Sequence, residues 1–292
     1  MTFRTLIQAT ELHHLMQSPR ADLVVFDVSF DLTNAAAGHR AHMASHLPGA
    51  RYLHLDRDLA GPKTGLNGRH PLPERDVFIA RLAQWGVGER TQVVVYDQSG
   101  AMFAGRLWWM LRWAGHEAVA VLDGGLAAWS AQGLPLATGE TAEPAGAAMT
   151  APAPLPSRPS AVPTVDRQTL LNNLNRPTRL VIDARSADRF RGENETLDPI
   201  GGRIPGARNR FFKDNLGPDG RFKPAEVLRA EFAALTDGRA PQELVMQCGS
   251  GVTACHNLLA MAHAGLDGAT LYPGSWSEWS AWPDAPVATG PA

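Results

Sequence analysis

Cys248 stands where a predicted strand changes into a predicted helix. Residues 244–246 form an apolar run typical of a buried strand, and residues 252–264 have the pattern of a helix, with a Gly-Ser-Gly turn at 249–251 between them. Backbone N–H groups converge at such a turn, and with the helix dipole they favour a thiolate over a thiol. The sequence therefore predicts a nucleophilic cysteine, although a buried structural cysteine fits the same position.

The composition is that of a globular protein with room for two domains. The chain has 292 residues, of which 44% are hydrophobic and 19% charged, and its formal net charge is −2. This balance gives neither the basic field of a nucleic-acid-binding protein nor a polybasic membrane anchor. We therefore expect no nucleic-acid partner and no membrane partner.

Cysteine usage points to a reducing compartment. Cys248 and Cys255 are the only two cysteines, so a disulfide scaffold is not indicated. The first residues lack the hydrophobic region of a signal peptide, and no later run is long enough to span a bilayer. We expect a cytoplasmic protein in which Cys255 packs within the helix, or forms a regulatory disulfide with its neighbour.

The second half of the chain repeats the pattern of the first. The matched features, at offsets of 150 to 157 residues, are the strand-ending Asp27 and Asp183, the Pro-Gly-Ala turns at 48–50 and 205–207, the strand-ending Asp97 and Cys248, and the tryptophans Trp129 and Trp279. Strands alternate with helices in both copies. The sequence therefore predicts an α/β protein made by tandem duplication, each copy with a parallel sheet flanked by helices.

The repeat also predicts the domain boundaries and a single active site. We assign residues 1–137 to the first domain, 138–162 to an Ala/Pro-rich linker and 163–292 to the second domain. Asp97 occupies the position of Cys248 in the first copy, where it is a good helix cap but no soft nucleophile. We expect catalysis in the second domain, supported by the first.

Several cysteine chemistries do not fit the residues around Cys248. A cysteine phosphatase needs an arginine six positions later, where this chain has Ala254. A papain-like site needs a general-base histidine, for which there is no local signature. Two cysteines seven positions apart with His256 do not have the spacing of a zinc site. A thiolate in a neutral cradle of N–H groups remains, which could carry a sulfur atom without a metal or an organic cofactor.

Five segments of the second half carry a family resemblance: Asp-Ala-Arg at 183–185, Arg-Phe-Arg-Gly at 189–192, Ile-Pro-Gly-Ala at 204–207, Cys-Gly-Ser-Gly-Val-Thr-Ala at 248–254 and Gly-Ser-Trp-Ser-Glu-Trp at 274–279. With them, both halves resemble rhodanese domains. Apart from the linker, the chain is similar to the two-domain thiosulfate and 3-mercaptopyruvate sulfurtransferases. The resemblance implies transfer of a sulfane sulfur from a small donor to a thiol or cyanide acceptor, through a persulfide on Cys248.

The loop composition implies the donor. Thiosulfate enzymes of this family usually carry basic residues directly after the cysteine, whereas the mercaptopyruvate type carries Cys-Gly-Ser-Gly-Val-Thr, as here. We expect 3-mercaptopyruvate, with thiosulfate as the alternative. The backbone N–H groups of the substrate-binding residues are expected to stabilise the charged sulfur; these residues are Gly249, Gly251, Val252 and Thr253.

The resemblance also implies roles for four side chains. Ser250, His70 and Asp56 match the Ser-His-Asp arrangement proposed for the mercaptopyruvate type, although loop packing explains His70 and Asp56 equally well. Arg189 matches the arginine that holds the substrate carboxylate, with a surface salt bridge as the simpler explanation.

This chain departs from the family pattern at one substrate-binding position. The mercaptopyruvate type often has a second arginine nine residues after the first, and that position is Asp198 here. Arg203 and Arg191 are candidates to replace it. A thioredoxin-like reductant is a candidate acceptor, and a persulfide-carrier module with little turnover is an alternative function.

Overall fold

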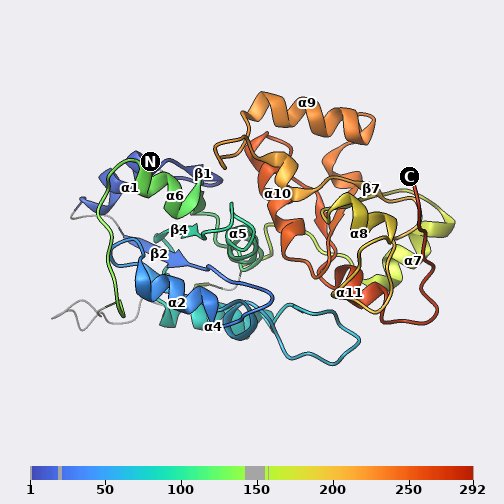
Figure 1. Cartoon of the computed structure of the whole chain (residues 1–292), viewed down its shortest axis with the longest axis horizontal. Coiled ribbons are helices and arrows are strands. Elements are labelled where there is room, and N and C mark those ends of the chain that lie inside the picture. The colour runs from blue at the N-terminus through green and yellow to red at the C-terminus, as the bar shows by residue number, and fades with distance from the viewer. Residues whose placement is uncertain (1, 19–21, 142–154, 157, 292) are drawn as a thin grey trace. The chain divides into compact units, whose positions relative to one another are not determined.

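The structure, a computed structural model, describes residues 2–18, 22–141, 155–156 and 158–291. It divides into two compact units, which are shown in Figure 1. The first unit comprises Met1–Leu59 and Pro73–Ala161, and the second comprises Ala60–Leu72 and Val162–Ala292. Residues 60–72, which the sequence pattern placed in the first domain, thus pack with the second unit. Most of the predicted linker, residues 142–154 and 157, lies outside the described residues.

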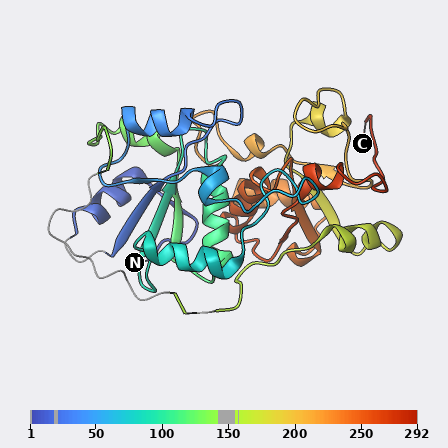
Figure 2. The same ribbon diagram turned by 90° about the horizontal axis from the view of Figure 1, so that it is seen from below.

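The first unit is a parallel sheet between helices. Its elements are β1 (Leu6–Ile7), α1 (Ala9–Met16), β2 (Leu23–Asp27), α2 (Ala37–Ala44), β3 (Arg51–Tyr52), α3 (Leu55–Asp58), α4 (Arg75–Gln84), β4 (Gln92–Tyr96), α5 (Ala104–Trp113), β5 (Val119–Leu122) and α6 (Gly125–Ala131). The strand order is β1-β5-β4-β2-β3 and every pairing is parallel. Figure 2 shows these strands side by side between helices.

Helices on both faces explain why β4 reads as a continuous apolar run. Its five residues are all buried. Val94 faces one layer, where Leu12 of α1 and Trp129 of α6 complete the core. On the other face, Phe26 of β2 contacts Trp85 at the end of α4, with 6.0 Å between ring centroids. The α/β prediction for this copy is confirmed.

The second unit repeats this architecture. Its elements are α7 (Arg167–Asn175), β6 (Leu180–Asp183), α8 (Ala187–Arg191), β7 (Arg208–Asn209), the 3₁₀ helix η1 (Phe212–Asn215), α9 (Ala225–Thr236), the 3₁₀ helix η2 (Pro241–Glu243), β8 (Leu244–Gln247), α10 (Thr253–His263), β9 (Thr270–Leu271) and α11 (Ser275–Trp279). The strand order β7-β6-β8-β9 matches β3-β2-β4-β5 of the first unit, and all pairings are parallel. A parallel bridge between Thr164 and Leu271 stands where β1 pairs with β5. The predicted duplication is therefore confirmed at the level of topology.

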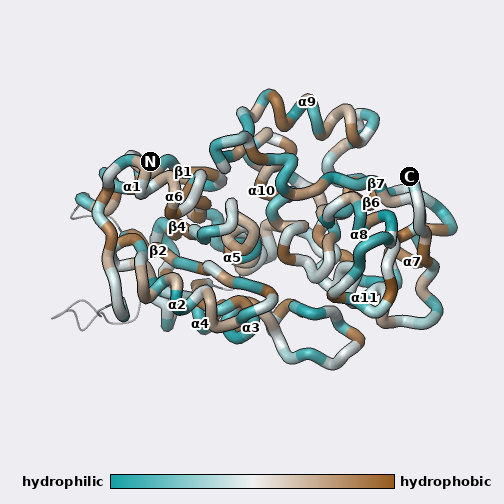
Figure 3. Tube along the Cα trace, in the orientation of Figure 1, coloured by the Kyte–Doolittle hydropathy of each residue, from teal (hydrophilic) through white to brown (hydrophobic). Residues whose placement is uncertain are grey.

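The core of the second unit also lies on both faces of its sheet. Val245 of β8 packs in one cluster with Leu170 of α7 and Trp276 of α11. α10 packs against β8 and α9. Leu228 and Phe232 are buried on α9, whose tube alternates between hydrophilic and hydrophobic colours in Figure 3. Among the described residues, no helix has the length and apolar character needed to cross a membrane.

The segment 60–72 is attached to the second unit by its backbone. The Gly61 amide donates to the Pro71 carbonyl and closes the segment into a loop. Gly68 has a φ of +86°, and a Cβ there would lie 2.7 Å from the Gly274 carbonyl oxygen, so this contact requires glycine. The next amide, that of Arg69, donates to Ser277 Oγ at 2.9 Å. These contacts place two side chains of the segment, Arg69 and His70, at the end of the sheet where α10 and α11 begin.

Candidate active site

Cys248 follows β8 directly and is 2% exposed. Its backbone is fixed by the start of α11, because the Trp276 amide donates to the Cys248 carbonyl at 2.9 Å and the Cys248 amide donates to Ser275 Oγ at 3.1 Å. The Ser250 amide donates to Cys248 Sγ at 3.5 Å. Cys248 thus lies between the end of β8 and the start of α10, where the sequence pattern placed it, and the Ser250 amide is directed at its sulfur.

The Gly-Ser-Gly turn is shaped by one obligatory glycine. Gly251 has a φ of +74°, and a Cβ at this position would lie 2.3 Å from the Pro273 carbonyl oxygen. The following residues, Val252 and Thr253, begin α10, where backbone N–H groups have no partner within the helix. Cys255 is fully buried on α10 and its Sγ donates to the Gly251 carbonyl at 3.3 Å. Cys255 therefore packs within the helix, as expected.

The first unit shows what this loop binds. Asp97 is 1% exposed and its carboxylate accepts four backbone N–H groups; their donors are Ser99 at 2.8 Å, Ala101 at 3.0 Å, Phe103 at 2.7 Å and Ala104 at 2.8 Å. An ordinary helix cap satisfies one such donor. The loop between β4 and α5 is therefore an anion cradle filled by the chain's own carboxylate. In the second unit the same turn carries Cys248 instead.

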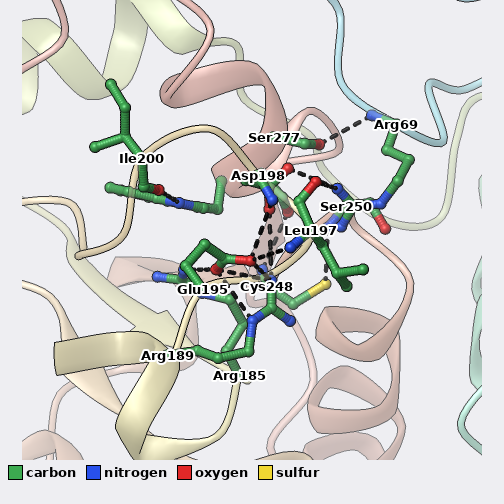
Figure 4. A network of polar contacts seen from close by, with 12 residues as sticks. Arg69, Arg185, Arg189, Glu195, Leu197, Asp198, Ile200, Cys248, Ser250 and Ser277 are labelled. Atoms are coloured by element: carbon green, nitrogen blue, oxygen red, sulfur yellow. Dashed lines mark hydrogen bonds and ion pairs between the residues drawn. The ribbon is translucent and has the colours of Figure 1, made fainter. Parts of the chain in front are cut away.

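Two guanidinium groups lie over the cysteine loop at Gly249. A Cβ on Gly249 would lie 3.0 Å from Arg69 Nη2, 3.6 Å from Arg189 Nη2 and 3.7 Å from Arg189 Nη1. Arg189, on α8, is fixed by Glu195, which accepts from its Nε at 3.0 Å and its Nη2 at 2.8 Å. Arg69 Nη1 donates to Asp198 at 2.6 Å, and Arg189 Nη2 lies 3.4 Å from the same carboxylate (Figure 4).

Arg189 lies beside the cysteine loop, and its binding of a substrate carboxylate stays a prediction; Arg69 was missed by the sequence reasoning. The available signal was its position beside His70, a residue already considered. The two acids of the network are nearly inaccessible, since the side chain of Glu195 is 4% and that of Asp198 3% exposed. Burial raises the pKa of Asp198 even though the charge of Arg69 opposes the shift.

A third arginine, Arg185, pairs with the same carboxylate, Glu195, as Arg189. Arg185 is 3% exposed, and its Nη2 donates to Asp183 and to the Gly202 carbonyl, each at 2.6 Å. Burial opposes its charged form, but the negative charges of Asp183, Glu195 and Cys248 prevail and raise the pKa of Arg185. This buried cation, held by Asp183, contributes positive potential to the site.

The structure brings His70 and Ser250 together. His70 Nδ1 and Ser250 Oγ are 2.7 Å apart, and both residues are buried. Asp56 belongs to α3 of the first unit, where its backbone amide donates to His54 Nδ1 at 3.2 Å. Two members of the expected Ser-His-Asp arrangement thus meet in the second unit, and the part played by Asp56 stays a prediction.

The two candidates for the second substrate arginine are engaged elsewhere. Arg203 donates to the carbonyls of Gly290 and Pro291 at 2.6 and 3.0 Å. Arg191 forms an ion pair with Glu193 at 2.7 Å. The part of the chain that the structure describes contains no cluster of three or more His, Cys, Asp or Glu side chains arranged to hold a metal ion.

Comparison with known proteins identifies the family. The model of the rhodanese-like domain matches residues 8–132 and again residues 166–281. The chain belongs to the rhodanese family. The probable 3-mercaptopyruvate sulfurtransferase of Pseudomonas aeruginosa is 45% identical to this rhodanese-family chain over 292 residues, covering 99% of the chain and 100% of the relative. The thiosulfate sulfurtransferase of Mus musculus is 33% identical, covering 95% of the chain and 92% of the relative.

A solved structure agrees with these matches. The crystal structure of SseA from Escherichia coli, described as a 3-mercaptopyruvate sulfotransferase with the rhodanese fold, superposes with a TM-score of 0.76. It is 28% identical and covers 94% of this chain and 99% of the SseA chain. The rhodanese fold that the sequence motifs implied is therefore confirmed.

Proposed function

We propose that the protein is a sulfurtransferase that takes sulfur from 3-mercaptopyruvate onto Cys248 and passes it to a thiol or to cyanide. The observation that carries the proposal is the pair of matching loops. In the first unit the loop binds a carboxylate through four N–H groups, whereas in the second unit the matching loop follows Cys248 and directs the Ser250 amide at its sulfur. A loop built to stabilise negative charge around a sulfur suits a persulfide anion.

The first half-reaction forms an S–S bond and breaks a C–S bond. The Cys248 thiolate attacks the donor sulfur, and the C–S electron pair leaves with the three-carbon fragment as the enolate of pyruvate. The donor's S–H proton is transferred to that carbon, so the products are a Cys248 persulfide anion and pyruvate. The cysteine sulfur and the donor sulfur each lose one electron in forming the S–S bond, the donor carbon gains two, and no external electron carrier is required.

The Ser250–His70 pair supports the proton transfer. Their 2.7 Å contact places a hydroxyl and an imidazole in series beside the cysteine loop. An imidazole can take a proton at one nitrogen and return it in a later step, as general acid–base catalysis requires. We assign this pair the movement of the proton from the donor sulfur toward the carbon.

The second half-reaction restores the enzyme. A thiolate acceptor attacks the outer sulfur, its electron pair forms the new S–S bond, and the pair of the old bond returns to Cys248 as a thiolate. A thioredoxin-like dithiol is a suitable acceptor because its second thiol can release the sulfur as sulfide. Two cysteines in 292 residues are a usage typical of a reducing compartment, and we propose a cytoplasmic location for the protein.

Donor choice rests on the side chains of the loop. Gly249, Ser250 and Gly251 add no positive charge next to the sulfur, which suits a monoanionic keto acid better than the thiosulfate dianion. Relatives named for either donor match this chain, so thiosulfate remains the second candidate. The ratio of the two kcat/KM values distinguishes the donors, and a clear preference for thiosulfate would contradict the assignment.

The Cys248→Ser variant tests the proposed function. Incubation of the wild type with 3-mercaptopyruvate should add the mass of one sulfur atom to the peptide that contains Cys248, and the variant should neither gain this mass nor release pyruvate. Cys255→Ser is the matched control and should retain both activities, because Cys255 is packed inside α10. Sulfur transfer by the Cys248→Ser variant from both donors would refute the mechanism. A persulfide on the wild type without steady-state turnover would favour the carrier function.

A further inference from the structure

We infer that Ser275 is a positioning residue of the sulfur-transfer site, which holds the backbone of Cys248 through its hydroxyl. The inference rests on the proposed function and extends it to a residue that acts through the main chain of the nucleophile. Ser275 is the first residue of α11 and is fully buried. Its Oγ accepts from the Cys248 amide at 3.1 Å and donates to the Tyr272 carbonyl at 2.9 Å. The hydroxyl therefore joins Cys248 to the chain that follows β9.

The backbone of Ser275 has a conformation that serine rarely adopts. Its φ is +53°, in the left-handed region, where the Cβ of an L-residue crowds the following carbonyl oxygen. Among the described residues, the other non-glycine residues with a positive φ are Ala101, whose amide binds the Asp97 carboxylate, and Asp237, which ends α9. Strain of this kind persists where surrounding contacts enforce it, and it is concentrated at functional sites. The serine side chain must therefore supply something that an unstrained glycine would not.

The first copy has the unstrained residue at the matching position. Gly125 matches Ser275 at the offset of 150 residues that relates Trp129 to Trp279, and its φ is +55°. Glycine adopts this φ without steric cost. A Cβ on Gly125 would also lie 2.3 Å from the Asp97 carbonyl oxygen, so a larger residue does not fit there. Of the two copies, the one with the nucleophile thus places a side chain at this turn, and that side chain binds the nucleophile's amide.

Three hydrogen bonds join the start of α11 to the cysteine loop, and one of them depends on a side chain. The Trp276 amide donates to the Cys248 carbonyl at 2.9 Å. The Ser277 amide donates to the Gly249 carbonyl, also at 2.9 Å. These two bonds join backbone groups and require no particular residue at position 275. The third bond, from the Cys248 amide, requires the hydroxyl of Ser275.

Loss of the hydroxyl should change the position of the sulfur. Cys248 is 2% exposed, so its amide would become a buried donor without an acceptor, which is unfavourable. We expect the peptide bond before Cys248 to rotate toward another acceptor and to carry the side chain with it. Sγ lies 3.5 Å from the Ser250 amide, and this contact would lengthen. The expected consequence is a less reactive sulfur, while the groups that bind the donor keep their positions.

Two variants separate the hydroxyl from the strain. Ser275→Ala and Ser275→Gly both remove the hydroxyl, but only the glycine variant relaxes the backbone. Both should slow the single-turnover formation of the Cys248 persulfide by about 10-fold, the effect of one lost hydrogen bond, and leave the inhibition constant of pyruvate unchanged. Alkylation of Cys248 by iodoacetamide should slow by a similar factor, because it uses the same sulfur and needs no sulfur donor. The urea midpoint should be higher in Ser275→Gly than in Ser275→Ala, the reverse of the order in an ordinary helix.

The control variant is Ser130→Ala, which removes an exposed hydroxyl from α6 and should change none of these measurements. Wild-type rates in Ser275→Gly would overturn the inference, since the rates would then follow the strain rather than the hydroxyl. A pyruvate inhibition constant that rises as the rate falls would overturn it too, because the hydroxyl would then act on donor binding. A urea midpoint no higher in Ser275→Gly than in Ser275→Ala would contradict the strain at this position. A wild type that forms no persulfide would remove the proposed function, whereas the alkylation rates would still test Ser275, so the two failures are distinguishable.

Discussion

The buried Asp97 carboxylate should be a main support of the first unit. It accepts four backbone N–H groups at 2.7 to 3.0 Å and is 1% exposed. Each buried donor left without an acceptor costs about 1–3 kcal/mol. Asp97→Asn keeps the shape and one oxygen, but it turns an N–H₂ group toward the two donors that Oδ2 now accepts, those of Phe103 and Ala104. The expected loss of unfolding free energy is therefore roughly 2–6 kcal/mol.

Urea unfolding and hydrogen exchange test this expectation. A loss of this size is a large part of the 5–15 kcal/mol that is typical of a domain. The midpoint of the first unfolding transition should fall, and the amides at the start of α5 should exchange faster in Asp97→Asn than in the wild type. Asp31→Asn is the control, because Asp31 accepts from the Thr33 amide in an exposed turn and its removal should leave the midpoint in place. An Asp97→Asn protein with the wild-type midpoint and exchange rates would refute the cradle reasoning.

Two further outcomes are expected. Gly251→Ala would force a Cβ to within 2.3 Å of the Pro273 carbonyl oxygen and strain a φ of +74°. The rate of persulfide formation at Cys248 should therefore fall by about 100-fold. Mass spectrometry of the donor-treated protein measures this rate, and a wild-type rate in the variant would contradict the expectation. Burial lowers the pKa of His116, whose Nε2 lies 2.9 Å from the Thr91 carbonyl oxygen. The unfolded chain therefore binds a proton at higher pH than the folded chain, and stability is lost as pH falls below about 6.5, by at most about 1.4 kcal/mol per pH unit. The pH slope of urea unfolding should be shallower in His116→Gln, and equal slopes would show that His116 does not titrate on unfolding.

The sequence pattern predicted those strands and turns whose residue types follow directly from their own burial or backbone conformation. β2, β4 and β8 are apolar because helices cover both faces of each sheet, so their sequences identify them without any partner. The turn after β8 was recognisable because a positive φ at Gly251 leaves little choice of residue. Strands of two residues such as β3 and β7 carry no such signal, since their pairing depends on the strand beside them.

The site was predicted less completely because part of it comes from a distant segment. Arg189 and Cys248 belong to motifs, and their neighbours in sequence are also their neighbours in space. Arg69 reaches the loop only because Gly68 packs on Gly274, a contact across about 200 residues of sequence that no periodicity encodes. From the sequence alone, Asp198 is only a departure from the arginine that the family often has at this position. In the structure it is the ion-pair partner of Arg69.

The two cradles differ in what surrounds them, and this difference explains why one copy can be catalytic. In the second unit, Asp183 pairs with Arg185, a buried cation whose charge interacts with Cys248. In the first unit, Ser29 stands at the position that matches Arg185. There Asp27 accepts from the Ser29 hydroxyl at 2.6 Å and lies 3.0 Å from His42 Nδ1. A backbone cradle alone holds a fixed carboxylate such as Asp97, where burial raises the pKa and the four backbone N–H donors oppose that shift. A sulfur that must alternate between thiolate and persulfide anion, beside a donor that brings a second negative charge, needs the cations as well. Two features therefore distinguish the site of the second unit from its counterpart in the first: the nucleophile Cys248 in place of Asp97, and the arginine network beside it.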